Sequence, residues 1–375
     1  MKKAIWVVVA MVLIAGMLLA TMTACPAPVT QTTTNVTTTI QTTITSTIAP
    51  QQVIWRYRAY SGSVNSTDYL AAVAAADRIL DRTDGAVKMD VFPGGALGYG
   101  GSEVPTLIAR GFLEAGLCPT DFLGTLEPAL LVMGLPFLYL SQDQRYETIG
   151  QNAENYLPIK VGHNSAVVTK IRELTDGVNL RYIDNSTRIS GVLTKEPYKI
   201  ETVEDWQGVH LRAYSATNAG AWTALGSTSI IIPYSEVYSA LASGVADGTG
   251  GSAGTIRDMS IWEVVKWYCH WPIAPYSEVV TCNPQAYSLL SAENQLIIDE
   301  ELASIVKAIE KDDGWVLENS FEPTWTANGL VDVYPTLEDI IAGKDLCEAN
   351  LWPGILADGG ADAQDLLDLI MAAQA

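Results

Sequence analysis

The chain of 375 residues carries 22 basic and 42 acidic side chains, which gives a formal net charge of −20 at pH 7. An acidic surface of this kind repels phosphate backbones and argues against nucleic acid as a partner. The same field opposes any anionic ligand, so an anion site in this chain requires local arginines, and each well-placed arginine is informative.

The N-terminus has the order of charge followed by apolar residues that is typical of an export signal. Lys2 and Lys3 precede an uncharged stretch over residues 4–24,. Cys25 follows small residues directly and resembles the lipobox of bacterial lipoproteins, although methionine stands where leucine is usual three positions earlier. We therefore predict a lipoprotein signal peptide over residues 1–25, with lipidation at Cys25. An uncleaved membrane helix, which needs about 20 apolar residues, is the alternative.

The next segment has the composition of a spacer. Residues 26–50 are rich in threonine and proline and contain neither a charge nor an apolar period of 2 or 3.6, so they cannot build a core. We predict a disordered linker that tethers the folded part to the membrane. The remaining residues, from 51 to 375, are enough for two domains of ordinary size.

Four cysteines follow Cys25, and none of them shows the Cys-x-x-Cys spacing of a zinc or redox site. They are Cys118, Cys269, Cys282 and Cys347. We therefore expect no metal and no cofactor. The segment between Cys269 and Cys282 could turn back on itself and allow one disulfide, but buried free thiols are the simpler interpretation.

The first elements of the folded part alternate between strands and helices. Residues 53–60 alternate apolar with polar and predict a strand, a helical pattern follows over residues 69–80, and a second strand is predicted over residues 87–92,. This order implies right-handed crossovers and a mainly parallel sheet.

A second unit of the same kind is predicted further along the chain. Strands are expected over residues 208–214 and 229–232, with a helix over residues 216–225 between them,. A further helix should open at Pro233 and end before Gly244, because proline suits a first helical turn and glycine a C-terminus.

The last predicted element of this series is a long helix over residues 291–319. Acidic residues occur early in it and lysines late, which complements the helix dipole,. Its length would let it span both units.

Four segments, in order and at characteristic separations, then point to a family. They are residues 85–98 (GAVKMDVFPGGALG), 135–139 (LPFLY), 202–212 (TVEDWQGVHLR) and 233–248 (PYSEVYSALASGVADG). Together they resemble the solute-binding proteins of TRAP (tripartite ATP-independent periplasmic) transporters, the dicarboxylate-binding receptor family. The likeness covers nearly all of residues 53–340.

The resemblance implies an α/β fold of the two-lobed periplasmic-binding-protein kind (type II-like), with crossing strands and a long lobe-spanning helix. We predict a first lobe from residues 51–185 plus about 277–318. The second lobe is predicted from about 186–276 plus 319–375. The implied function is that of an extracytoplasmic receptor without catalytic activity, which closes about a hinge on a ligand held between the lobes.

The resemblance also assigns candidate ligand-binding residues. In the family, the arginine that ends the Gly-x-x-x-Arg strand pairs with the ligand carboxylate, and the matching position is Arg212. Its rigid guanidinium fork suits two carboxylate oxygens and keeps its charge. A surface or hinge ion pair is the alternative for Arg212. Arg188 falls where some members carry a second ligand arginine, and a solvated hinge arginine is its alternative.

Three further positions bear on the kind of ligand. Gly251 replaces an asparagine that often helps to hold the ligand, which puts the usual ligand in doubt. Trp222 and Tyr234 belong to an aromatic-rich second half, and an aromatic wall would select a ring-bearing or bulky acid, although such residues are more often core. The implied partners are a small mono- or dicarboxylate and the membrane permease subunits of a TRAP-type system. The implied location is the periplasm or cell surface, with a lipid anchor in the membrane.

Two alternatives from other classes remain at this point. Residues 250–254 match the Gly-x-Ser-x-Gly pattern of a hydrolase with Ser252 as its nucleophile, but the only histidine downstream is His270, 18 residues on,. A structural or adhesive surface lipoprotein would also have an anchor, a threonine-rich stalk and a globular head.

Overall fold

The strands of the chain form one hydrogen-bonded set that divides into two sheets. The computed structural model describes residues 52–140, 166–311 and 317–374, with no account of the side chains at 187–189, 274–277 and 317–321. The described strands are β1 (Val53–Arg58), β2 (Val87–Phe92), β3 (Ala115–Pro119), β4 (Arg181–Thr194), β5 (His210–Ala213), β6 (Thr228–Ile231), β7 (Gly248–Gly251), β8 (Trp267–Cys282) and β9 (Val331–Val333). They pair in the order β2-β1-β3-β8-β4-β7-β5-β6, and β9 pairs with β8.

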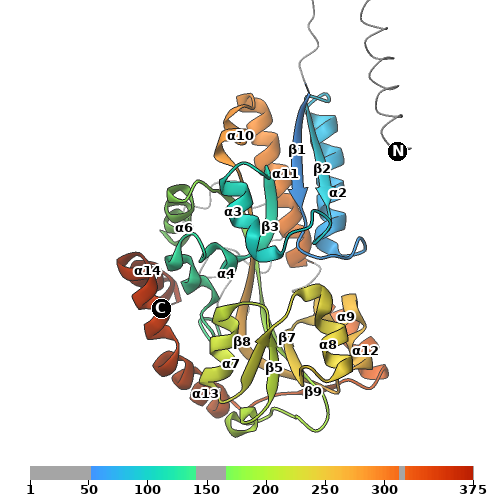
Figure 1. Cartoon of the computed structure of the whole chain (residues 1–375), viewed down its shortest axis with the longest axis vertical. Coiled ribbons are helices and arrows are strands. Elements are labelled where there is room, and N and C mark those ends of the chain that lie inside the picture. The colour runs from blue at the N-terminus through green and yellow to red at the C-terminus, as the bar shows by residue number, and fades with distance from the viewer. Residues whose placement is uncertain (1–51, 141–165, 312–316, 375) are drawn as a thin grey trace, which may run out of the picture. The chain divides into compact units, whose positions relative to one another are not determined.

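Two long strands join the sheets. β4 and β8 run antiparallel from the Arg181–Cys282 pair to the Thr194–Trp267 pair. At one end β8 pairs with β3, while at the other end β4 pairs with β7 and β8 with β9. We call β2, β1, β3 and the adjoining ends of β4 and β8 the first sheet, and β6, β5, β7, β9 and the opposite ends the second sheet (Figure 1). The expected crossing strands are thus present.

Helices cover both sheets. The described α-helices are α2 (Thr67–Arg82), α3 (Val104–Ala109), α4 (Thr120–Leu123), α6 (Ala166–Gly177), α7 (Ala216–Ala224), α8 (Val237–Ser243), α9 (Ala253–Met259), α10 (Pro284–Ser288), α11 (Ala292–Glu310), α12 (Leu317–Ala327), α13 (Leu337–Asn350) and α14 (Trp352–Gln374). Short 3₁₀ turns include η2 (Pro128–Gly134), η3 (Val203–Trp206) and η4 (Tyr234–Glu236). No helix in the described ranges is both long and apolar enough to cross a membrane.

The sequence patterns placed most elements within a few residues. The predicted 87–92 strand is β2, and the predicted 69–80 helix is α2, which extends two residues further at each end. The pairs β1–β2, β1–β3, β5–β6 and β5–β7 are parallel as expected, whereas β4 and β8 pair antiparallel with each other. Pro233 precedes the 3₁₀ turn η4 instead of opening a regular helix, and Gly244 ends α8 in the left-handed conformation,.

The predicted long helix is α11, and it ends at Glu310, earlier than the expected residue 319. Its buried aliphatic face packs on α2 and on β4, and joins the core beneath the first sheet. Arg78 and Arg82 of α2 both pair with the nearly buried Glu301 of α11. Apolar packing and ion pairs therefore both hold α2 and α11 together on one face of the first sheet.

The C-terminal helix α14 packs against η2 and α6. The Trp352 indole donates to the Pro136 carbonyl at 3.2 Å, and the Gln374 amide donates to the Leu138 carbonyl at 3.0 Å. Residues 319–375 were predicted for the second lobe, and α14 nevertheless contacts chain from the range predicted for the first lobe. The lobe boundaries stay a prediction.

The four described cysteines are free and buried. Cys269 and Cys282 lie near opposite ends of β8, 13 residues apart in a strand that rises about 3.3 Å per residue, or roughly 40 Å,. The segment between them does not turn back, so the disulfide that the sequence left open does not form. The simpler interpretation, buried free thiols, is confirmed.

We predict that a fragment from Gln51 onward is unreactive toward thiol reagents at pH 8 until it unfolds. Burial raises the pKa of Cys118 to about 12 and that of Cys269 to about 11, so almost no thiolate forms and reagents have no access,. Titration with a chromogenic disulfide reagent should detect about four thiols in denaturant and almost none in the native protein. Rapid labelling of the native fragment would contradict this arrangement.

Candidate functional site

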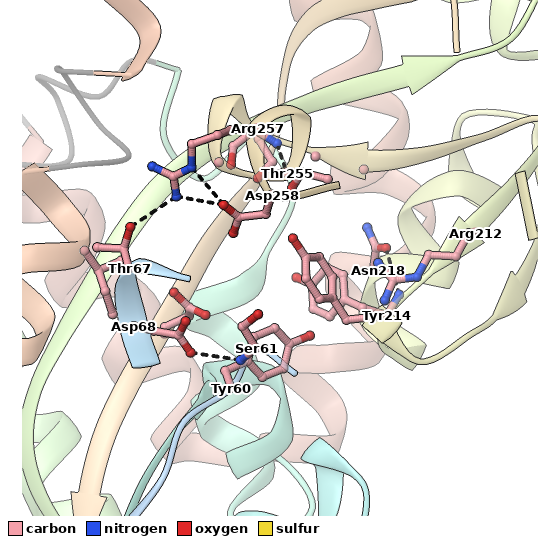
Figure 2. Close-up of a pocket in the computed structure, with 18 residues that line it drawn as sticks. Tyr60, Ser61, Thr67, Asp68, Arg212, Tyr214, Asn218, Thr255, Arg257 and Asp258 are labelled. Carbon is pink, nitrogen blue, oxygen red and sulfur yellow. Dashed lines mark hydrogen bonds and ion pairs between the residues drawn. The ribbon is translucent and has the colours of Figure 1, made fainter. Parts of the chain in front are cut away.

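A pocket lies between the two sheets and takes residues from both. It encloses about 730 Å³, open solvent at its mouth included. Tyr60 and Asp68 come from the loop after β1 and the start of α2. Arg212 comes from β5 and Asp258 from α9, on the second sheet, so these groups face one another across the pocket (Figure 2). The carboxyl ends of parallel strands are the usual place for ligand sites in α/β folds.

Arg212 is the principal buried cation of this pocket. It sits in β5 between β6 and β7, and only 4% of its surface is exposed. Its Nε donates to the Ile232 carbonyl at 2.9 Å, and the guanidinium carbon lies 6.0 Å from the centroid of the Tyr214 ring. No carboxylate in the described part of the chain pairs with it, so the alternative of a structural ion pair finds no support there.

Tyr234 and Gly251 also line the pocket, as their candidate roles require. The Tyr234 ring lies 5.8 Å from that of Tyr60 between centroids, so an aromatic pair bridges the two sides. Gly251 ends β7, where a Cβ atom would lie 2.6 Å from Leu193 Cδ1 and 3.2 Å from Thr255. Glycine at this position therefore lets α9 start close against β4.

The structure places Trp222 in the core and not on the pocket wall. It is fully buried and stacks on Trp206 with ring centroids 5.5 Å apart, because its large apolar surface is best satisfied there,. Its indole N–H donates to the Arg212 carbonyl at 3.2 Å, and its ring lies against Gly250. Trp222 therefore supports the strand that carries Arg212 and does not itself line the pocket.

Two remaining candidates, Arg188 and Cys25, have no described side chain. The Arg188 backbone belongs to β4 and pairs with Tyr276 of β8, but its side chain lies outside the described residues. Cys25 and the signal and linker segments lie outside them as well.

Contacts that sequence reasoning missed connect the two sides of the pocket. Arg257 of α9 donates to the Thr67 hydroxyl of α2 at 3.1 Å and pairs with Asp258 at 2.8 Å. Ser215, the N-cap of α7, donates to Asp121 of α4 at 2.6 Å. The available signal for Thr67 was its position at the start of the helix that follows β1, because the loops after parallel strands gather at one edge of the sheet,.

Asp121 is a buried carboxyl group with an altered acidity. Burial raises its pKa to about 6, against hydrogen bonds from Ser215 and Tyr214 that act in the opposite direction,. A Cβ atom at Gly134 would lie 2.1 Å from Asp121 Oδ1, so Gly134 leaves the room that this carboxyl occupies.

The hydrolase interpretation lacks a base at the serine. Ser252 lines the pocket, but it caps α9, and its backbone N–H donates to the Thr255 hydroxyl. His210 contacts Thr228 and His270 contacts Asp332, and neither lines the pocket, while His163 lies outside the described residues. Within the described residues no group of three potential ligands could hold a metal ion.

Residues 59–312 match the family described as "bacterial extracellular solute-binding protein, family 7" (DctP). The chain belongs to this family. Family 7 proteins are binding proteins and not enzymes, so the hydrolase interpretation is set aside.

Among characterised relatives, the chain is similar to the 2,3-diketo-L-gulonate-binding periplasmic protein YiaO of Escherichia coli, with 23% identity over 63% of this chain and 68% of the relative. It is 24% identical to the sialic acid-binding periplasmic protein SiaP of Vibrio cholerae over 66% of this chain and 71% of that one. The uncharacterised protein YiiZ of Salmonella typhimurium is 23% identical over 62% of this chain, and the match spans 66% of that protein's length.

Solved structures share the two-lobed fold. A TRAP periplasmic solute-binding protein from Desulfovibrio salexigens with bound orotic acid superposes with a TM-score of 0.74 at 21% identity, covering 86% of this chain and 99% of that one. DctP6 of Bordetella pertussis, a receptor binding pyroglutamic acid, gives 0.74 at 17% identity and covers 85% and 100%. The predicted α/β fold class is confirmed.

We predict that Asp121 makes the protein more stable in mild acid. Because its pKa is raised in the folded state, its contribution is fully present below pH 4 and is lost as the pH rises through about 6,. The loss approaches about 3 kcal/mol at most. Urea unfolding from pH 4 to 7 should show the free energy of Asp121→Asn rising relative to that of the wild type.

The matched control for this experiment is Asp77→Asn, which removes a carboxylate from the exposed face of α2. Its unfolding free energy should follow that of the wild type across the same pH range. Parallel curves for Asp121→Asn and the wild type would show that Asp121 titrates normally.

Proposed function

We propose that this chain is the receptor of a TRAP-type transporter that captures a small organic carboxylate between its two sheets, with Arg212 as the anchor. The observation that carries the proposal is the burial of Arg212 in the pocket without a carboxylate partner among the described residues. An unpaired buried guanidinium costs several kcal/mol by order of magnitude, which a bidentate carboxylate would offset. Structural or adhesive lipoproteins have no need of such a site.

The chemistry of the similar proteins supports an acid as the ligand. Solved structures of the same fold contain orotic acid, β-D-galacturonate, D-glucuronate and pyroglutamic acid, each of which carries a carboxyl group. In this chain Tyr60, Tyr214 and Tyr234 line the pocket and offer ring surfaces to a cyclic or bulky acid,. A mono- or dicarboxylate with a ring is the ligand class that these residues suit best.

The contacts across the pocket support closure on the ligand. Arg257 donates to Thr67 and Ser215 donates to Asp121, so hydrogen bonds join elements that belong to the two sides. A ligand that touches both sides stabilises this arrangement by its differential affinity for the closed form. Permease subunits in the membrane would then receive the closed receptor, a step inferred from the family. Arg188 is a further candidate for ligand contact on the same basis.

We predict that the fragment from Gln51 onward is stabilised by a carboxylate and that Arg212→Ala abolishes the effect. Ligand at 100 times its dissociation constant adds about 2.7 kcal/mol of stability, and losing the arginine should weaken binding by about 30-fold or more. A thermal-shift screen with orotate, D-galacturonate, D-glucuronate, pyroglutamate and simple dicarboxylates measures this, and calorimetry gives the affinities.

Arg78→Ala is the control, because Arg78 lies on α2 and pairs with Glu301 away from the pocket. It should keep wild-type affinity. A hit that Arg212→Ala retains would move the site elsewhere. An absence of any hit would favour the adhesive or structural alternative, and ester turnover that Ser252→Ala abolishes would revive the hydrolase.

The anchor is part of the same proposal. The order of signal segment, Cys25 and a threonine-rich linker supports a receptor that remains attached to the membrane while its folded part diffuses near the permease,. Expressed at full length in a bacterial host, the wild type should fractionate with membranes and carry a diacylglyceryl mass at Cys25. Cys25→Ser should remove that added mass. A wild-type protein without the added mass and with an intact N-terminus would indicate an uncleaved membrane helix instead.

A further inference from the structure

A second cavity adjoins the pocket and shares Arg212 with it. It encloses about 740 Å³, open solvent included, and Tyr60, Tyr214 and Tyr234 also line both. Its other walls include the end of β1, the glycine-rich loop after β2, Phe122 and the segment of residues 231–235. The start of that loop belongs to the family-like segment of residues 85–98.

Arg58, the last residue of β1, lines this cavity. Only 4% of its surface is exposed, and its Nε and Nη1 atoms are buried without a hydrogen-bond partner in the described part of the chain. The guanidinium lies over the face of Tyr60, whose ring centroid is 5.9 Å from the guanidinium carbon. Such a contact is weaker than an ion pair and leaves the N–H groups unsatisfied.

Arg56 provides an internal comparison on the same strand. It is exposed, and its guanidinium makes two hydrogen bonds with Glu114, at 2.9 Å from Nε and 2.8 Å from Nη2. Arg58 and Arg212 are the two arginines buried within the described residues, and neither has a carboxylate partner there. Both line the second cavity, one from each sheet.

Glycines bring backbone close to Arg58 without filling the cavity. A Cβ atom at Gly94 would lie 2.3 Å from the Tyr60 carbonyl, so only glycine allows the loop to approach there. A Cβ atom at Gly101 would lie 3.7 Å from Arg58 Nη1 and 3.1 Å from Phe122. Glycine at these two positions therefore lets the loop pack closely on Tyr60 and Phe122, and Gly101 places no side chain beside the guanidinium.

The charges of the two cavities differ in sign. Among the described residues that line it, the second cavity has Arg58 and Arg212 and no acid, so its formal charge is 2 − 0 = +2. The first pocket has two arginines and three acids, Asp68, Asp258 and Glu278, so its formal charge is 2 − 3 = −1. An anionic group is thus favoured in the second cavity, and hydrogen-bond donors are favoured in the first.

We propose that the second cavity is an anion subsite in which Arg58 and Arg212 hold the ligand's carboxylate group from opposite sides. The uncharged part of the ligand lies in the acid-lined pocket, where carboxylates accept from its hydroxyl or N–H groups. This inference rests on the proposed function and narrows the ligand to carboxylic acids that carry hydrogen-bond donors, such as hydroxylated acids or cyclic amide acids.

The test compares Arg58→Gln, Arg212→Gln and the control Arg56→Gln in the fragment from Gln51 onward. Calorimetry measures affinity for D-glucuronate against D-glucose and for pyroglutamate against 2-pyrrolidinone, pairs that differ mainly in the carboxylate. For the acid that binds, Arg58→Gln should lower affinity at least about 30-fold, while Arg56→Gln leaves it unchanged. The neutral partner of that pair should bind weakly and equally to the wild type and Arg58→Gln.

A second arm uses sulfate and needs no knowledge of the ligand. At matched ionic strength, sodium sulfate should raise the melting temperature of the wild type and Arg56→Gln, relative to sodium chloride, by more than that of Arg58→Gln. Without added anion, Arg58→Gln should melt at or above the wild-type temperature, because it removes an unpaired buried charge. A purely structural arginine would instead lower the melting temperature and leave the sulfate effect unchanged.

The outcomes separate the two proposals. Acid binding that requires Arg212 but not Arg58 overturns the subsite and leaves the proposed function intact. If no acid binds but the sulfate effect depends on Arg58, the anion subsite stands and the proposed acid receptor fails. Equal behaviour of Arg58→Gln and Arg56→Gln in both arms overturns the inference.

Discussion

The antiparallel pairing of β4 with β8 is the constraint on which the rest of the structure depends. Each strand belongs to both sheets, so the same hydrogen-bonded ladder that orders the first sheet also orders the second. The pocket lies alongside this ladder, and Ser190 and Glu278 of these strands line it. The relative position of Tyr60 and Arg212, which come from different sheets, is therefore set through two strands.

A few ionisable side chains at and near the pocket are buried at a cost in free energy. Arg58 and Arg212 are buried without acid partners among the described residues, and Asp121 is buried with a raised pKa. The surrounding core offsets these costs: Trp206, Trp222 and Trp271 form a fully buried aromatic cluster behind β5. The aromatic cluster thus stabilises β5 from one side, and the polar groups of β5 on the other side are free to serve the pocket.

Sequence patterns located the elements well because local periodicity determines them. β2 and α2 follow directly from alternation and helical spacing, and the family pattern led to Arg212 on the pocket wall. The features that the sequence did not predict depend on tertiary contacts. The alternating strand pattern treats Arg56 and Arg58 alike, yet Arg58 is buried because the glycine-rich loop after β2 closes over the end of β1.

Other errors have the same origin. Trp222 was placed on the ligand side, since composition does not show which face of α7 meets the core. The sequence left a turn between Cys269 and Cys282 open because no local signal indicates that β8 crosses both sheets as one strand. Thr67 and Arg257 are 190 residues apart, so their contact depends on the assembled fold alone.

The register of β4 against β8 shifts between Ser190 and Val192, and Gly191 lies at that shift, where a Cβ atom would come within 2.5 Å of the Cys269 carbonyl. An irregular step of this kind bends the strand that carries it and increases its local twist. Ser190, beside the shift, also borders the pocket. The angle at which β4 passes from the first sheet to the second is therefore set next to the ligand site, and one glycine without a side chain permits it.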